Sequence, residues 1–196
     1  MNDHEQQPPA PQRGKILDAL ARAERAIFTR KIPKSATAQM KFLLTRTKDS
    51  TKDLAERLGT SRRTVERYRA GQIKTPQKKL QEALLRETES EWQPQVRAQA
   101  RERAATSGGM WVECTAYFGF EANGSSDDGR QRVISAPISP TYAAEILAAQ
   151  EDGATEEELH PIVAAAITES YFTEWGTIAA GLQANFTDVV SLEIQF

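Results

Sequence analysis

The sequence has few of the residues that build several common kinds of site. Cys114 is its only cysteine, which excludes an intrachain disulfide and a cysteine-rich metal centre. Its two histidines, His4 and His160, have no partner at a metal-ligand spacing, so we expect no metal site and no intrinsically bound cofactor. The sequence also lacks a glycine-rich phosphate loop and a nucleophile elbow. We therefore expect a protein that does not perform catalysis unaided.

Long apolar runs are also missing. No stretch approaches the length of a transmembrane helix, and the N-terminal residues carry no secretory signal. These features predict a cytoplasmic protein with no membrane partner. Residues 1–12 are polar and proline-rich, which predicts a disordered tail.

Positive charge is scarce in the second half of the chain. Residues 106–196 hold 2 Lys and Arg against 14 Asp and Glu, a net charge of −12. Residues 1–105 hold 23 Lys and Arg against 13 Asp and Glu, a net charge of +10. The overall net charge of −2 therefore conceals a basic half and an acidic half. This division predicts two modules with different partners. The basic module suits DNA phosphates, and the acidic module suits a protein or the basic half of its own chain.

The basic half contains a pattern typical of a helix-turn-helix over residues 51–70. Gly59 supplies the positive φ angle of a sharp turn, and Ser61 is placed to cap the helix that follows. Apolar residues at helical spacing on both sides of the turn predict one shared core: Leu54, Ala55, Leu58, Val65 and Tyr68.

The outer face of the second helix in this pattern carries side chains suited to a DNA major groove. Arginines reach guanine edges or phosphates, and hydroxyl and N–H groups at a helix N-terminus commonly hold phosphate. The candidate DNA-binding residues are Thr60, Ser61, Arg62, Arg63, Thr64, Arg67, Lys74, Lys78 and Lys79. The alternative is an ordinary helical hairpin with a solvated basic face, which applies above all to the three lysines. The pattern does not distinguish base contacts from phosphate contacts.

Further helices are predicted around this motif, over about residues 14–28, 35–45, 75–92 and 95–105. In the third of these, Thr75 is expected as the N-cap and Pro76 as the first helical residue. The last helix carries three arginines that either extend the DNA footprint or dock the acidic half, namely Arg97, Arg101 and Arg103.

The composition changes at residues 106–109, Thr-Ser-Gly-Gly, which predicts a flexible break between domains. Alternating residues then predict strands over 110–120, 130–136 and 190–196, the first two forming a hairpin. Two helices are predicted over about residues 140–150 and 155–172. The fold class is therefore α+β: an all-α helix-turn-helix domain (residues 13–105), followed by a small domain (residues 106–196) with about three strands covered by two helices.

Several segments resemble one known family. They are Phe28-Thr-Arg-Lys-Ile-Pro-Lys-Ser35, Thr64-Val-Glu-Arg-Tyr68, Trp92-Gln-Pro94, Arg103-Ala-Ala-Thr-Ser-Gly-Gly109 and Phe118-Gly-Phe120. In this order they resemble the telomere terminal proteins (Tpg) of actinomycete, Streptomyces-type, linear chromosomes and plasmids. The resemblance runs from about residue 14 to the C-terminus.

The resemblance implies protein-primed DNA replication. Proteins of this family bind telomeric DNA, become attached covalently to its 5′ end and prime synthesis from a threonine hydroxyl. The implied partners are a telomere-associated protein and a DNA polymerase, through which Mg²⁺ and the dNTP are supplied. The matching position for the priming threonine is Thr115. From the residues alone, Thr115 is simply a good strand residue, and Thr106 and Ser107 are rival hydroxyls.

Two other interpretations remain open at this stage. The chain is alternatively a helix-turn-helix transcription regulator whose acidic domain dimerises or binds a small ligand. Self-association is a further possibility, because an exposed strand at the end of the chain would pair readily with a second copy.

Overall fold

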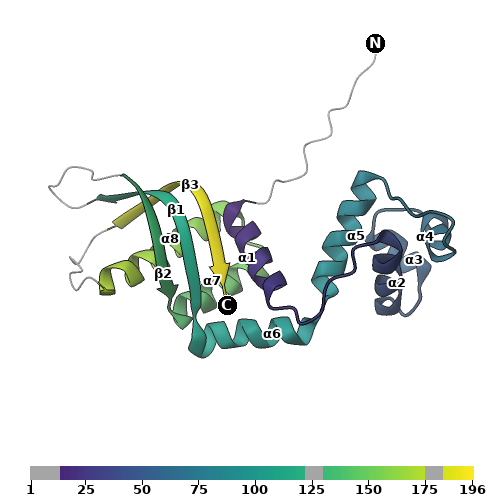
Figure 1. The fold of residues 1–196 in the computed structure, drawn as a ribbon, viewed down its shortest axis with the longest axis horizontal. Coiled ribbons are helices and arrows are strands. Elements are labelled where there is room, and N and C mark those ends of the chain that lie inside the picture. The colour runs from purple at the N-terminus through teal and green to yellow at the C-terminus, as the bar shows by residue number, and fades with distance from the viewer. Residues whose placement is uncertain (1–13, 122–129, 175–182) are drawn as a thin grey trace, which may run out of the picture. The chain divides into compact units, whose positions relative to one another are not determined.

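The computed structural model describes residues 14–121, 130–174 and 183–196. The predicted tail over residues 1–12 and the turn expected after residue 121 lie outside the described residues. The elements are α1 (Lys15–Ala26), α2 (Ala36–Arg46), α3 (Thr51–Arg57), α4 (Arg62–Arg69), α5 (Lys78–Glu91), α6 (Pro94–Arg103), the π-helical turn η1 (Ala104–Gly108), β1 (Met110–Glu121), β2 (Arg130–Ile138), α7 (Pro140–Glu151), α8 (Glu156–Glu174) and β3 (Gln183–Gln195) (Figure 1). The predicted α+β fold class is confirmed.

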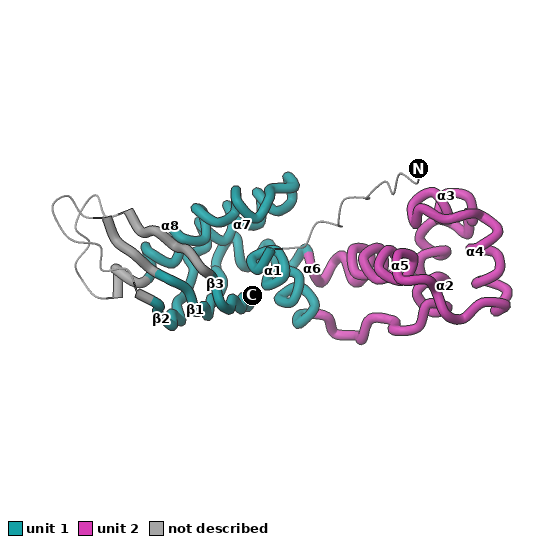
Figure 2. Tube along the Cα trace, turned by 90° about the horizontal axis from the view of Figure 1, so that it is seen from above, with its two compact units in different colours: residues 1–27, 98–196 teal, residues 28–97 magenta. Residues whose placement is uncertain are grey.

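The chain forms two compact units, which Figure 2 shows in different colours. The helical unit comprises residues 28–97, and the sheet unit comprises residues 1–27 and 98–196. This division differs from the predicted boundary at residue 105, because α1 packs its buried Ile16 and Leu20 into the core of the sheet unit. An amphipathic pattern identifies the buried face of a helix but not the core that receives it.

In the helical unit, the predicted helix-turn-helix is present as α3 and α4. Gly59 has a φ angle of 61°, and its N–H donates to Glu56 O while the N–H of Thr60 donates to Ala55 O. These two bonds satisfy carbonyls at the end of α3 and form a Schellman motif. The core of this unit contains the whole predicted set together with residues of α2 and α5: Met40, Leu43, Leu44, Leu54, Ala55, Leu58, Val65, Tyr68, Ala83 and Leu84.

The helix expected from Thr75 begins later than predicted. Residues 73–77 are not helical, Gln77 is the extended N-cap, and α5 starts at Lys78. Ile73 is partly buried against the core of the helical unit, which anchors the connection before the helix. The residue before a proline also favours an extended conformation, so Pro76 does not force a helix start on its own.

The sheet unit contains an antiparallel sheet with the strand order β2-β1-β3. Alternate residues of each strand, such as Val112, Cys114 and Ile134, are buried against helices. Figures 1 and 2 show α7 and α8 on one side of the strands. Because α1 contributes to the same core, three helices pack on the sheet where two were predicted. The opposite side is termed the open face; its described residues in the central strand β1 are Trp111, Glu113, Thr115 and Tyr117.

The predicted flexible break at residues 106–109 is instead mostly helical. The turn η1 continues α6 without interruption, and the chain direction changes at Gly109, whose φ angle is 65°. A Cβ atom on this glycine would lie 2.1 Å from the carbonyl oxygen of Ile138. Gly109 therefore ends the helix and permits close approach to the end of β2.

Strand β3 lies at an edge of the sheet, and α1 supplies donors to that edge. Arg22 Nη2 donates to the carbonyl of Leu192 at 2.6 Å, and Lys15 Nζ donates to the carbonyl of Val190 at 3.2 Å. These bonds occupy carbonyls that would otherwise accept from an added strand. Over the described residues, the helices are too short or too polar to cross a membrane.

Candidate functional site

Helix α4 is built so that its basic side chains face outward. The side chain of Ser61 accepts from the N–H of Thr64 at 3.2 Å and caps the helix. Val65 and Tyr68 are buried and fix the rotation of α4 about its axis. All five charged residues of the helix are consequently exposed, namely Arg62, Arg63, Glu66, Arg67 and Arg69.

The structure distinguishes Arg62 from the other two candidate arginines. Its Nε lies 2.8 Å from Glu66 Oε1 and 3.2 Å from Thr51 Oγ1. Arg62 therefore ties α4 to the first residue of α3 and is held in position by a carboxylate one turn along. Arg63 and Arg67 are exposed on the same helix, so they are the stronger candidates for reaching into a groove.

The candidate hydroxyls around the start of α4 differ in their surroundings. Ser61 Oγ and Thr64 Oγ1 lie 2.9 Å apart and share a hydrogen bond, while Thr60 is half-buried in the turn. Ser61 and Thr64 therefore stabilise the helix start whether or not a phosphate binds there. The three candidate lysines are exposed in the segment that follows, Lys74 before α5 and Lys78 and Lys79 in its first turn.

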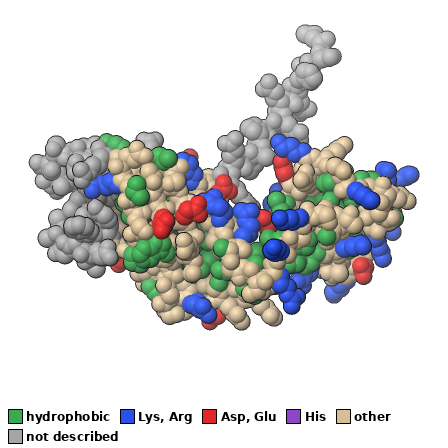
Figure 3. Space-filling view, in the orientation of Figure 1, with side chains coloured by type: hydrophobic (Ala, Val, Ile, Leu, Met, Phe, Trp, Pro, Cys, Tyr) green, Lys and Arg blue, Asp and Glu red, His purple; other side chains and the backbone are tan. Residues whose placement is uncertain are grey.

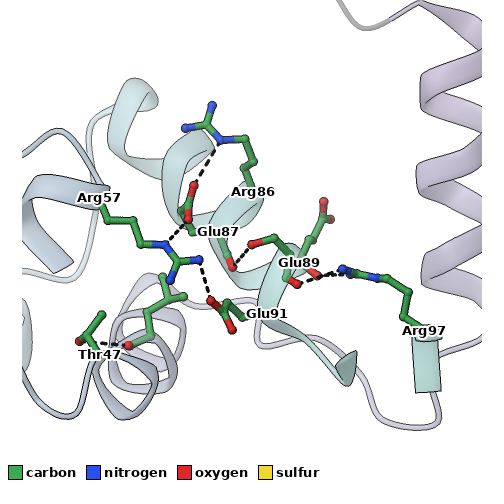
Figure 4. Close-up of polar contacts among 9 residues, drawn as sticks. Thr47, Arg57, Arg86, Glu87, Glu89, Glu91 and Arg97 are labelled. Carbon is green, nitrogen blue, oxygen red and sulfur yellow. Dashed lines mark hydrogen bonds and ion pairs between the residues drawn. The ribbon is translucent and has the colours of Figure 1, made fainter. Parts of the chain in front are cut away.

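An arginine that the sequence analysis did not single out joins α3 to α5 (Figure 4). Arg57 Nε donates to Glu87, and Arg57 Nη2 lies 2.8 Å from Glu91 Oε1. Partial burial would lower the pKa of Arg57, but the hydrogen bonds and charges of Glu87 and Glu91 raise it. This ion-pair network holds the helix-turn-helix against α5. Arg57 is 30 or more positions away from both glutamates, so no local pattern predicts it.

The three arginines of α6 differ in what they contact. Arg97 donates to the carbonyls of Glu89 and Ser90 at the end of α5 and lies over the Phe28 ring. Arg101 donates to Glu24 Oε1 at 2.6 Å and to Leu147 O at 2.9 Å, near the end of α7. Cations are favourable at helix C-termini, so both side chains have structural roles within their own units. Arg103 is exposed.

Basic residues concentrate on and after α4. Residues 62–79 contain seven Lys and Arg against one Glu. The whole helical unit holds 17 Lys and Arg against 8 Asp and Glu, a net charge of +9. The sheet unit has a net charge of −11. The two units therefore differ strongly in charge, and the positive charge of the helical unit is concentrated around α4.

Thr115 lies in the middle of the central strand β1 on the open face of the sheet. Its neighbours across the ladder are Val133 on β2 and Ser191 on β3, and its side chain is half-buried. The helices pack on the other side of this strand, against Cys114 and Ala116. Thr115 thus lies on the side of the sheet away from the helices.

The sheet becomes irregular immediately beyond Thr115. This residue pairs with Ser191, but the next pair on the same side joins Tyr117 to Thr187. Three residues of β3 (188–190) therefore oppose one residue of β1, which is a β-bulge. Bulges bend a strand, increase its twist and frequently lie beside functional sites, where they redirect side chains.

The rival hydroxyls Thr106 and Ser107 are exposed but lie in η1 rather than in a loop. Thr106 Oγ1 donates to the carbonyl of Glu102 at 2.8 Å, and Ser107 Oγ donates to the carbonyl of Arg103 at 3.5 Å. Each hydroxyl satisfies a carbonyl one turn earlier in the helix, so its use as a nucleophile would require breaking that bond.

Cys114, next to Thr115, points into the core. Burial raises the pKa of this thiol to about 11, so it remains protonated and shielded at neutral pH. Burial also lowers the pKa of His160 in α8, against the opposing effect of Glu156. Within the described part of the chain, no three His, Cys, Asp or Glu side chains are grouped as metal ligands would be. Comparisons with protein-family models, curated proteins and solved structures found no match to this chain.

Proposed function

We propose that this chain is a telomere terminal protein, which binds telomeric DNA, becomes joined to its 5′ end and primes DNA synthesis from Thr115. It acts in the cytoplasm, at the ends of linear replicons in the nucleoid, together with a telomere-associated protein and a DNA polymerase. The observation that carries the proposal is the position of Thr115 on the open face beside a bulge, in a unit separate from the basic helix-turn-helix.

The opposite charges of the two units support separate roles, DNA binding by the helical unit and polymerase binding by the sheet unit. The exposed arginines of α4 and the lysines after it suit binding to a DNA duplex, and affinity from phosphate contacts falls steeply as salt rises. The sheet unit is acidic, so DNA repels it, and it suits a protein with a basic cleft. A polymerase has such a cleft because it ordinarily holds a polyanionic primer.

The proposed reaction places the threonine hydroxyl where the 3′-hydroxyl of a primer normally lies. Thr115 Oγ attacks the α-phosphorus of a dNTP, a new Oγ–P bond forms, the bond to the β-phosphate oxygen breaks, and pyrophosphate leaves. The proton of the hydroxyl passes to a base or water in the polymerase site. Divalent metal ions of the polymerase align the hydroxyl and stabilise the developing charge.

The test is a deoxynucleotidylation assay with full-length protein, polymerase fractions from the host, the host's telomere-associated protein, a telomeric template and labelled dNTPs. Digestion and mass spectrometry then locate the label. We expect a dNMP on Thr115 that is lost in Thr115→Ala and retained in Thr115→Ser. The matched control is Ser191→Ala, which removes the neighbouring hydroxyl on the same face and is expected to leave labelling unchanged.

Two other results would change the proposal in different ways. Label on Thr106 or Ser107 would keep the primer function and move its site to η1. The complete absence of label, in a mixture that labels a control terminal protein, would contradict the primer function and favour a helix-turn-helix transcription regulator.

A further inference from the structure

The open face combines large apolar side chains with the proposed acceptor hydroxyl. On β1, Trp111 and Tyr117 are 42% and 38% exposed, on either side of Thr115 in the sequence. Val133, directly opposite Thr115 on β2, is 82% exposed. Trp111 is held by a hydrogen bond from its indole Nε1 to Ser135 Oγ at 3.1 Å. Exposed aromatic and aliphatic residues around one polar group are typical of a protein interface.

The charged residues of this face are carboxylates. Glu113 lies two residues before Thr115 and pairs across the ladder with Glu193 of β3, while Arg22 of α1 reaches Glu193 from the edge at 3.3 Å. Among the described open-face positions of the three strands there is no Lys or Arg. Hydrophobic and acidic side chains gather over the strands in Figure 3. Two carboxylates placed directly opposite each other destabilise a sheet, which favours a role for them outside the fold.

We infer that the open face is the surface by which this chain docks on the basic cleft of a DNA polymerase. The inference rests on the proposed function, and it adds which side of the sheet unit enters the cleft and which residues make the contact. Trp111, Val133 and Tyr117 supply the apolar contact around the acceptor hydroxyl. Glu113 supplies a negative charge near the place where a primer would present its last phosphate.

Other occupants of this face fit the charges less well. A DNA duplex would be repelled by Glu113 and by the net charge of −11 on the sheet unit. A second copy docking face to face would bring together two sheet units that each have a net charge of −11, which like-charge repulsion disfavours. A basic cleft is instead attracted both by the Glu113 carboxylate and by the net negative charge of the sheet unit.

The test compares two charge reversals that change the net charge equally. Glu113→Lys lies on the open face, whereas Glu157→Lys lies on α8, where Glu157 is exposed. Affinity of the full-length variants is measured by surface plasmon resonance against the purified polymerase that labels the wild-type chain. We expect Glu113→Lys to weaken binding by about tenfold or more and Glu157→Lys to change it by less than about twofold. Val133→Lys is a second open-face variant, and circular dichroism checks that each variant folds.

The outcomes separate the docking surface from the priming function. Equal affinities for folded Glu113→Lys, Val133→Lys and Glu157→Lys would overturn the docking surface while leaving priming by the wild-type chain intact. Thr115→Ala is expected to lose labelling, because it lacks the acceptor hydroxyl. A dimer that dissociates in Val133→Lys but not in Glu157→Lys, seen by sedimentation without polymerase, would assign the open face to a second copy and contradict the inference.

Discussion

At the residue scale, Gly109 is the position where the fold depends most directly on the lack of a side chain. Gly109→Ala would place a Cβ 2.1 Å from Ile138 O and would strain a φ angle of 65°. We expect it to lower the free energy of unfolding by about 3 kcal/mol or more, measured by urea denaturation. Gly153→Ala is the matched control, because its φ angle is also positive but nothing lies within 4 Å of the added atom. The free energy of unfolding of this control should fall by only about 1 kcal/mol. Equal decreases in both variants would contradict the steric argument.

Cys114 gives a second prediction at this scale. Because its pKa is raised by burial from 9.0 to about 11, the thiol favours folding below pH 9, and this contribution is lost as the pH rises toward 11. We expect its reaction with a thiol reagent at pH 8 to be at least about a hundredfold slower in the native chain than in urea. Fast native reaction would mean that the strand opens near Thr115. Cys114→Ala, which does not react, is the control for labelling elsewhere.

At the scale of elements, the start of α1 depends on a carboxylate from α8. Glu156 accepts from the N–H groups of Ile16 and Leu17, at 2.7 and 3.2 Å. We expect Glu156→Gln to lower the free energy of unfolding of the sheet unit by about 1 kcal/mol, because it removes a charge at a helix N-terminus. The exposed neighbour Glu157 also lies in the first turn of α8 but makes no bond to α1, so Glu157→Gln should lower the free energy of unfolding by less in the same thermal or urea titration. A loss of equal size in both variants would instead indicate a general effect of charge.

Helix α4 makes the corresponding prediction for DNA. Arg63→Ala and Arg67→Ala are each expected to weaken binding to a telomeric duplex by about tenfold, measured by fluorescence anisotropy at several salt concentrations. A residue that contacts phosphate should lower the salt dependence, whereas one that reads a base should relax sequence preference. Arg86→Ala on α5 removes an exposed charge away from α4 and serves as the control. Equal effects of all three variants would contradict recognition by α4.

At the scale of the whole molecule, the sheet unit is discontinuous in sequence. Four α1 residues are buried in its core, Ile16, Ala19, Leu20 and Ala23. Each large apolar side chain among them stabilises the unit by about 2–3 kcal/mol. Deletion of residues 1–27 should therefore unfold the sheet unit and leave the helical unit folded, as seen by amide NMR spectra. Deletion of residues 1–13 alone, which retains α1, is expected to leave both units folded.

Local patterns predicted most elements because they need only nearby residues. Thr155 and Glu158, three positions apart, form a capping box at the start of α8: Glu158 accepts from the N–H of Thr155 at 2.8 Å, and Thr155 Oγ1 accepts from the N–H of Glu158 at 3.3 Å. Gly59 and the alternation of β1 were read correctly for the same reason. The predicted break was wrong over residues 106–108, because Thr, Ser and Gly are compatible with both a loop and a helical turn.

The sequence by itself determined the α+β fold class, the helix-turn-helix and the division between a basic and an acidic half, because periodicity, turn residues and charge are properties of neighbouring positions. Only the tertiary structure decided that α1 belongs with the sheet, that Arg101 binds α1 and α7, and that Thr115 lies on an open face beside a bulge. Each of these depends on contacts between residues far apart in the chain. Many pairings of amphipathic faces satisfy the local patterns equally well, and the choice among them is made when the cores pack.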